Sequence, residues 1–520
     1  MRGALDPDAM IAAASSLRDA LARAGFTHRG VQDVLGVSAS GFADLSSTPL
    51  VLWRTREPSP INTLVRLFIA GADVPARAAT EALGPAFEAC RRCGVIESAN
   101  ESGQVRAAFA LLPFEDVVNA ADFSLRPTGP VETAADHVMG VGRSSASLGR
   151  VALPLVAAAQ RRTGAASVLD LGCGGGYLAL RASLLGARAT GTDINLRAVM
   201  LGRFNAVLND CLAEFRLGSL FEPVATASFD VVISNPPFVI SPETGLIFRD
   251  GASQLPPGAA GHKRRGDEFC AAIARTGPAH LSEGGTLAML FNAVGDGPDA
   301  WVERVRSWTP PDVQVLAMRT DVQRTDEYAS MWIRHTASGR SDWSPGTFAR
   351  MFDEWMRYYE TLGVSHIAYG VLVIRRASPA FFDASHTESR WIDSGAIDLQ
   401  RHLDGREVLA GLGSDEPERR RAIMALAWRL ADDARVVRST VTGGGVDQHA
   451  AMVLGPMDRP VASISIGASD VITRASGVRT LDALVAEAAS VTGIDRAVLA
   501  QQVAAAAEEL IRDGMLVRAP

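Results

Sequence analysis

The residues best suited to chemistry form a short turn, Asn235-Pro236-Pro237-Phe238, directly after the stretch 230–234, whose centre is the β-branched run Val231-Val232-Ile233. The run predicts a buried strand, and the prolines must end it because neither can donate a ladder hydrogen bond. Asn235 would then stand at the carboxyl end of a strand, where open α/β sheets bind ligands. Its amide offers one acceptor and two donors, and Phe238 adds a flat face. A plain β-turn would explain the prolines but not these two neighbours. This NPPF turn therefore suits gripping a planar –NH2 group.

A glycine loop, residues 172–176, lies upstream between a predicted buried strand, 167–171, and a predicted helix. Such a loop lets the backbone approach a nucleotide-like ligand closely. Asp193 ends the next predicted strand, where an acid can accept hydrogen bonds from both ribose hydroxyls. The pattern predicts a cofactor that contains adenosine. Its expected contacts are Asp170, Gly172, Gly174, Gly176, Asp193 and Ile194, with Asn235 between the cofactor and the acceptor.

Two cofactors compete for this loop. Residues 174–179 fit the GxGxxA variant of the dinucleotide fingerprint, so an NAD-dependent dehydrogenase is the rival class. Asp170, however, would face a pyrophosphate unfavourably, whereas a cationic amino-acid tail would be attracted to it. The loop therefore favours S-adenosylmethionine.

These motifs together resemble a known family. Residues 168–176, Asp193 and the NPPF turn are similar to the motifs of class I S-adenosylmethionine-dependent methyltransferases of the amino-methylating NPPY/F branch. That branch includes rRNA guanine-N2, adenine-N6 and release-factor glutamine-N5 methyltransferases. The resemblance covers the middle of the chain, residues 130–377, and implies a late hairpin added to a parallel sheet. It also implies that Ser219 faces the adenine, where family members commonly carry an acid.

The chemistry of the acceptor assigns the catalytic roles. The lone pair of an amide or aryl amine is delocalised, which makes the nitrogen a poor nucleophile. If the Asn235 oxygen and the Pro236 carbonyl each accept one N–H bond, the nitrogen is drawn toward tetrahedral geometry and its lone pair points at the methyl group. Phe238 would stack on the planar group and exclude water. The predicted catalytic residues are therefore Asn235, Pro236 and Phe238.

Length and composition limit the number of domains, the cellular location and the mode of substrate binding. A chain of 520 residues exceeds one hydrophobic core, and we expect three domains, residues 1–130, 131–378 and 379–520. No apolar run is long enough for a membrane span, the first residues lack an apolar signal core, and five cysteines are too few for a disulfide framework. These features predict a cytoplasmic location. A net charge of −7 argues against a chain that coats nucleic acid by bulk charge.

The flanking regions carry less specific patterns. Three helices and a β-ribbon before residue 130 predict a winged-helix-like domain, and the helix–helix–strand pattern at the end predicts a second one within an α+β domain. A helix is expected over 419–432, and the Gly- and Ser-rich stretch 129–149 predicts a linker. The basic cluster 262–265 is either a solvated loop or a substrate lid with phosphate contacts.

The sequence therefore predicts an α/β fold, a Rossmann-like methyltransferase sheet flanked by two winged-helix-like domains. The predicted function is transfer of a methyl group from S-adenosylmethionine to a planar exocyclic amine, first of all on an RNA base such as one in rRNA. The alternative is glutamine-N5 methylation of a protein such as a release factor. A dehydrogenase and a non-enzymatic binding protein are the disfavoured interpretations.

Overall fold

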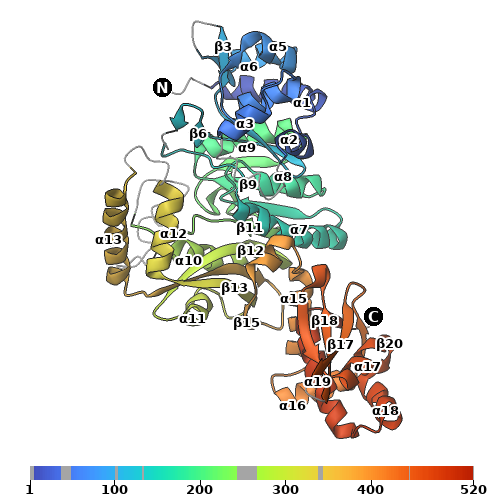
Figure 1. Cartoon of the computed structure of the whole chain (residues 1–520). Helices are drawn as coiled ribbons and strands as arrows, with labels where there is room; N and C mark the ends of the chain where they lie inside the picture. The colour runs from blue at the N-terminus through green and yellow to red at the C-terminus, as the bar shows by residue number, and fades with distance from the viewer. Residues whose placement is uncertain are drawn as a thin grey trace.

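The structure is a computed structural model that describes residues 5–36, 48–99, 103–131, 134–242, 266–337, 343–443 and 446–518. The basic cluster 262–265 lies outside these ranges. An eight-stranded sheet forms the centre of the molecule, and the two ends of the chain build smaller regions on either side of it (Figure 1). Within the described ranges, no helix combines the length and the apolar character that crossing a bilayer requires.

The N-terminal region consists of short helices and small sheets. Its first helix begins after Asp6, whose side chain accepts a hydrogen bond from the Ala9 amide, and the second begins after Thr27, which caps Gly30 in the same way. The helices are α1 (Pro7–Arg23), α2 (His28–Leu35), α3 (Thr48–Arg54), α4 (Pro60–Leu64), α5 (Ala76–Leu83) and α6 (Ala86–Arg92). The strands are β1 (Val74–Pro75), β2 (Ile96–Ser98), β3 (Gln104–Ala107), β4 (Ala110–Phe114), β5 (Val117–Ala121), β6 (Leu125–Arg126) and β7 (Gly129–Pro130).

The central sheet has the strand order β10-β9-β8-β11-β12-β14-β13-β15. Strand β14 is antiparallel to both of its neighbours, which confirms the late hairpin that the resemblance implied. The strands are β8 (Ser167–Leu171), β9 (Arg188–Asp193), β10 (Glu214–Leu217), β11 (Phe229–Ser234), β12 (Leu281–Gly295), β13 (Gln314–Arg324), β14 (His366–Arg375) and β15 (Phe381–His386).

Helices cover both faces of this sheet. Because side chains alternate along a strand, Ile233 of β11 packs on one side with α7 and α8, and Val232 packs on the other with α10 and α11. The helices of this region are α7 (Arg143–Thr163), α8 (Tyr177–Leu184), α9 (Leu196–Leu208), α10 (Glu268–Thr276), α11 (Trp301–Arg306), α12 (Thr325–Ala337) and α13 (Pro345–Leu362).

The N-terminal region shares its core with helix α9 of the sheet domain. Leu201 and Phe204 of α9 belong to the same buried cluster as Leu17 of α1 and Phe109. The rings of Phe109 and Phe204 meet edge to face at 5.6 Å. The first 130 residues are therefore packed onto the sheet domain through a continuous apolar core.

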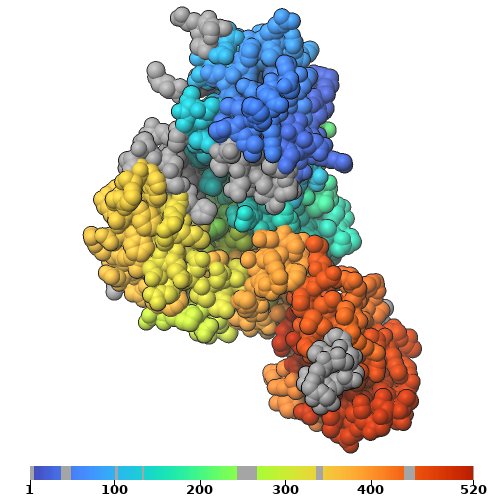
Figure 2. All heavy atoms as spheres, in the orientation of Figure 1, coloured from blue at the N-terminus to red at the C-terminus, as the bar shows by residue number. Residues whose placement is uncertain are grey.

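The C-terminal region forms a separate lobe beyond α15 (Figure 2). Helix α15 contacts both α7 and the last helix, and Arg406 on α15 donates to the Arg512 carbonyl at 2.6 Å. The helices are α14 (Ser389–Ser394), α15 (Leu399–Gly411), α16 (Glu416–Met424), α17 (Ile466–Thr473), α18 (Leu481–Thr492) and α19 (Arg496–Arg512). The strands are β16 (Ala427–Leu430), β17 (Arg435–Gly443), β18 (Val446–Leu454), β19 (Pro460–Ile464), β20 (Ser476–Thr480) and β21 (Leu516–Arg518).

Two local predictions were wrong. The helix expected over 419–432 ends at Met424, because Trp428 enters strand β16 and pairs with Arg518 of β21. The expected linker 129–149 is interrupted by the start of α7 at Arg143, a helix that continues to Thr163 through Pro154. The central sheet also extends beyond residue 378, since β15 pairs in parallel with β13.

Candidate active site

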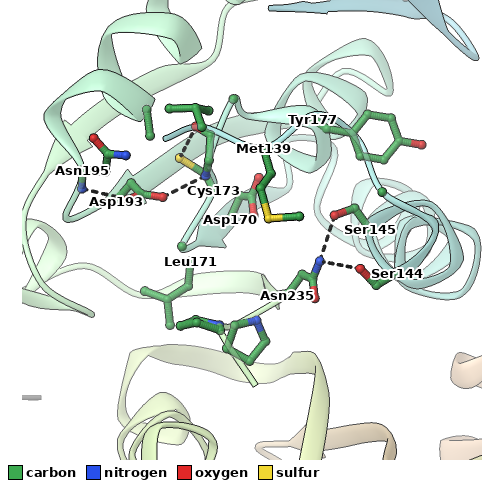
Figure 3. A pocket seen from close by; sticks show the side chains of 18 of the residues that line it. Met139, Ser144, Ser145, Asp170, Leu171, Cys173, Tyr177, Asp193, Asn195 and Asn235 are labelled. Atoms are coloured by element: carbon green, nitrogen blue, oxygen red, sulfur yellow. Dashed lines mark hydrogen bonds between the residues drawn. The ribbon is translucent and has the colours of Figure 1, made fainter. Parts of the chain in front are cut away.

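A cavity of about 650 Å³ opens at the carboxyl ends of β8, β9 and β11. Every residue predicted to contact the cofactor or the acceptor lines it except Gly176, which closes the glycine loop at the start of α8 (Figure 3). The predicted residues on its wall are Asp170, Gly172, Gly174, Asp193, Ile194, Ser219, Asn235, Pro236 and Phe238.

The glycine loop has a backbone that other residues would strain. Gly172, Gly174 and Gly176 all have positive φ angles, of 72°, 53° and 84°. A Cβ built on Gly172 or Gly174 meets nothing within 4 Å, so the backbone at both positions borders open space. A Cβ on Gly176 would lie 2.4 Å from the Phe215 ring. The first two glycines leave room for a ligand, and the third allows close packing.

Asp193 is anchored at the end of β9 by two backbone amides. Its oxygens accept hydrogen bonds from Gly174 and Asn195, each at 2.8 Å. An ionised carboxylate has about four acceptor positions, so Asp193 can still accept from a ligand hydroxyl. Burial raises the pKa of Asp193, although these N–H bonds counteract the rise. Ile194, 38 % exposed, and Ser219 lie beside it on the cavity wall.

Asp170 is the most buried acid of the cavity, with 2 % of its surface exposed. It accepts a hydrogen bond from the Ala179 amide at 3.0 Å, in the first turn of α8. Burial raises its pKa to about 7, and the Asp193 carboxylate adds to the rise. A cationic group would therefore be bound favourably here, because it would restore the charged form.

Asparagines that the sequence analysis did not single out support the glycine loop from behind. Asn119 on β5 and Asn205 on α9 both donate to the Gly175 carbonyl, at 3.1 and 2.8 Å. Asn205 and Asn209 also bond the β5 backbone, at Ala120 and Val118. The Asn205 and Asn209 side chains thus make hydrogen bonds to the β5 backbone of the kind that a strand on that side would make. Their spacing of four residues on one helix face was the only sequence signal.

Asn235 is held by two serines at the start of α7. Its amide nitrogen donates to the hydroxyl oxygens of Ser144 and Ser145, at 3.1 and 2.8 Å (Figure 3). Its oxygen is buried and, within the part of the chain that the structure describes, accepts no hydrogen bond. The sequence analysis missed both serines because they lie in the stretch predicted as a linker.

Aromatic side chains form the wall next to the NPPF turn. Phe238 and Trp332 of α12 meet edge to face, with ring centroids 6.3 Å apart. Phe269 of α10 and Met331 of α12 complete this side of the cavity. The NPPF turn therefore borders an apolar, aromatic part of the cavity wall.

Comparisons with known proteins identify part of the chain. Residues 152–258 match the family model described as "Methyltransferase small domain", and residues 23–108 match a domain of unknown function, DUF7059. A release factor glutamine methyltransferase from Geobacter sulfurreducens is 31 % identical over 132 residues, 25 % of this chain and 46 % of that protein. A ribosomal protein L11 methyltransferase from Chromohalobacter salexigens is 47 % identical over 72 residues, 14 % and 24 % of the two chains. The chain thus spans less than half the length of these two relatives.

Solved structures also show similarity. A putative class I S-adenosylmethionine-dependent methyltransferase from Listeria monocytogenes has 10 % identity and a TM-score of 0.30, and the match covers 74 % of this chain and 92 % of that one. A T. Thermophilus 16S rRNA methyltransferase in complex with AdoMet and guanosine has 19 % identity and a TM-score of 0.23, with coverage of 45 % and 58 %.

The strand order, the glycine loop and the family match define the class. The middle of the chain is a class I methyltransferase domain, and its cofactor is S-adenosylmethionine. Within that class, the turn Asn235-Pro236-Pro237-Phe238 is of the NPPY/F type.

Proposed function

We propose that the protein transfers a methyl group to the –NH2 group of a planar acceptor, and that this acceptor is an RNA base. The observation that carries the proposal is the buried Asn235 oxygen, which accepts no hydrogen bond within the described ranges although it lines the cavity. A buried acceptor without a donor is costly, about 1–3 kcal/mol. An acceptor nitrogen that carries hydrogens would supply the missing donor.

The residues present fit S-adenosylmethionine. Asp193 can still accept from a ribose hydroxyl, and Ile194 offers an apolar surface next to it. Asp170 would meet the ammonium group, and the open backbone at Gly172 and Gly174 would pass along the amino-acid tail. Ser219 is proposed to accept from the adenine amine.

When bound, the cofactor supplies an electrophilic methyl group on a sulfonium. Asn235 and the Pro236 carbonyl accept the two N–H bonds of the acceptor and turn its lone pair toward that methyl. Transfer of that methyl group to the oriented nitrogen would leave the nitrogen with one proton to release, and no side-chain base would be needed to start the attack. Phe238 fixes the tilt of the acceptor plane and excludes water.

Two acceptor classes remain, and each has its own support. The aromatic wall of Phe238 and Trp332 favours a base, since RNA-binding proteins recognise unpaired bases by stacking. The partial identity to release factor glutamine methyltransferases favours a glutamine side chain, which presents the same planar –NH2 group. The proposal places the base first and glutamine second.

One experiment tests the function and chooses the acceptor. Labelled S-adenosylmethionine is incubated with total RNA and, separately, with purified release factors, in single turnovers of the wild type and of Asn235→Ala. Label in RNA nucleosides supports the first acceptor, and label in glutamine supports the second. Transfer by Asn235→Ala at the wild-type rate, or transfer by neither protein, would contradict the proposal.

The flanking regions keep their predicted fold in this proposal. We propose three domains with the boundaries 1–130, 131–378 and 379–520, except that strand β15 (Phe381–His386) belongs to the sheet of the middle domain. The winged-helix assignment stays a prediction that the small sheets β1-β3-β2 and β20-β16-β21 support. All five cysteines are free thiols, which supports a reducing, cytoplasmic setting.

A further inference from the structure

Two hydroxyl groups converge on the amide of Asn235 from a different part of the chain. Ser144 and Ser145 stand in the first turn of α7, whereas Asn235 follows β11. The amide nitrogen lies 3.1 Å from the first hydroxyl oxygen and 2.8 Å from the second. A primary amide has two N–H bonds, so this pair, the serine clamp, uses both of them.

The clamp fixes which end of the amide faces the acceptor. A flip by 180° would keep the shape of the side chain but would leave two buried N–H groups without partners, whereas the observed orientation leaves one oxygen. Burying two unpaired donors costs more than burying one unpaired acceptor. The side chain therefore presents an oxygen and no donor.

The start of α7 is itself held in place. Ser147, two residues further along the helix, donates to the Asp393 carboxylate at 2.5 Å, and Arg150 donates to the Asp393 carbonyl at 2.6 Å. Leu148 and Val151 on the same helix are fully buried in the core of the sheet domain. The two clamping hydroxyls are thus mounted on a rigid element.

We propose that Ser144 and Ser145 are positioning residues that lock Asn235 as a pure acceptor and so restrict methylation to nitrogens that carry hydrogens. A ring nitrogen that only accepts hydrogen bonds would oppose the Asn235 oxygen and be rejected. The inference rests on the proposed function, because it describes how the same turn selects its acceptor.

The orientation can be observed without turnover. In protein labelled with ¹⁵N-asparagine, the side-chain signals of Asn235 are assigned by their loss in Asn235→Asp, and their hydrogen exchange is measured. We expect both N–H groups to be protected in the wild type and to lose protection in Ser144→Ala/Ser145→Ala. Equal exchange rates of the Asn235 side-chain N–H groups in the two proteins would overturn the proposal that the serines hold this amide.

Kinetic measurements then test the role of the serine clamp in catalysis. The assay is transfer of labelled methyl to total RNA and to release factors. Ser144→Ala/Ser145→Ala should lower kcat roughly ten- to a hundredfold, the usual loss when a reacting group is misplaced or its orienting partner is removed. KM for the acceptor and Kd for the cofactor should change less than about twofold. Ser144→Thr/Ser145→Thr keeps the hydroxyls and should restore most of the rate.

Two controls separate positioning from folding. Thr163→Ala removes a hydroxyl at the far end of the same helix, where it donates to the Ala159 carbonyl at 2.9 Å, and it should keep kcat. In an Asn235→Ala background, the double serine substitution should change kcat less than about twofold. A full effect in that background, or a wild-type kcat for the serine variant, would overturn the inference. Failure of the wild type to transfer label would count against the proposed function alone, because the amide signals judge the clamp independently.

Discussion

The proposed cofactor half of the cavity, around Asp170 and Asp193, and the proposed acceptor half, around Asn235, differ in how many of their polar atoms are hydrogen-bonded within the protein. In the cofactor half, Asp193 accepts two backbone amides and Asp170 accepts one. In the acceptor half, the Asn235 nitrogen is fully bonded while its oxygen is left without a donor within the described ranges. The first half is therefore built before the ligand arrives, and the second is completed only by the acceptor. Cofactor affinity and turnover should accordingly respond to different substitutions.

The strongest test of this contrast is Asn235→Ala. Removing the oxygen should lower single-turnover methyl transfer by roughly a hundredfold or more, the typical loss for one preorganised polar group at a reacting centre. The affinity for S-adenosylmethionine, measured by calorimetry, should stay nearly unchanged. Asn235→Asp is the matched variant. It keeps an acceptor, and the serine hydroxyls can turn to donate to the carboxylate, so partial activity is expected. A large loss of cofactor affinity in Asn235→Ala would break the division between the halves.

Asp193→Ala should show the opposite behaviour. We expect cofactor binding to weaken by about 1.5–3 kcal/mol, the scale of hydrogen bonds that involve a charged group, with kcat largely kept at saturating cofactor. Calorimetry with S-adenosylmethionine and with NAD measures the affinity and the choice of cofactor together. An unchanged affinity would remove Asp193 from the site, and tight NAD binding would contradict the cofactor assignment.

Asp170 makes the cofactor half sensitive to pH. Its pKa of about 7 in the folded protein lies above the ordinary value of 3.8, so the folded state binds this proton more tightly than the unfolded state. The contribution of Asp170 to stability is thus full below pH 4 and is lost as pH rises toward 7, by about 1.4 kcal/mol per pH unit. Unfolding midpoints of the cofactor-free wild type should fall through this window relative to Asp170→Asn. Parallel curves would show that Asp170 is not the buried acid responsible.

Asp170 should also make the affinity for S-adenosylmethionine depend on pH, but in the opposite direction from its effect on stability. The ammonium group of the cofactor needs the ionised carboxylate, so affinity should decrease as pH falls below 7 in the wild type. Asp170→Asn should bind more weakly and without this slope. Calorimetry at several pH values compares the two proteins.

The smallest effect is expected from Asn119→Ala. The substitution removes one of the two side-chain bonds to the Gly175 carbonyl, while the bond from Asn205 remains. We expect a loss of about 0.5–1.5 kcal/mol in unfolding free energy and a slight loss of cofactor affinity, with kcat unchanged. Asn62→Ala removes an exposed amide bond in the same N-terminal region and should leave cofactor affinity unaffected.

The central motifs were predictable because strong local signals agree there. The apolar run before Asn235, the paired prolines and the glycine loop each restrict the backbone, and all of them meet at one edge of the sheet. The strands predicted over 167–171 and 230–234 agree with β8 and β11 for the same reason.

The remaining features depend on distant partners. Gly142 and the serines 144, 145 and 147 are weak helix formers, and the start of α7 there is supported by distant partners: Asn235 donates to the Ser145 hydroxyl, and Ser147 donates to Asp393. Strand β15 is only half-buried and carries no clear alternation, yet it completes the edge of the sheet beside β13. Trp428 ends the helical pattern because its strand partner lies some 90 residues away, at Arg518. No local pattern encodes such pairings.

The shared core of the N-terminal region and α9 has a consequence for synthesis. The amides of Val118 and Ala120 on β5 donate to the side-chain oxygens of Asn209 and Asn205, which are translated 91 and 85 residues later. At about 5–20 residues per second, that delay is roughly 4–18 s. During it, the emerging chain exposes the apolar face that Leu201 and Phe204 later cover. The first 130 residues thus complete their fold only after the cofactor loop has been translated.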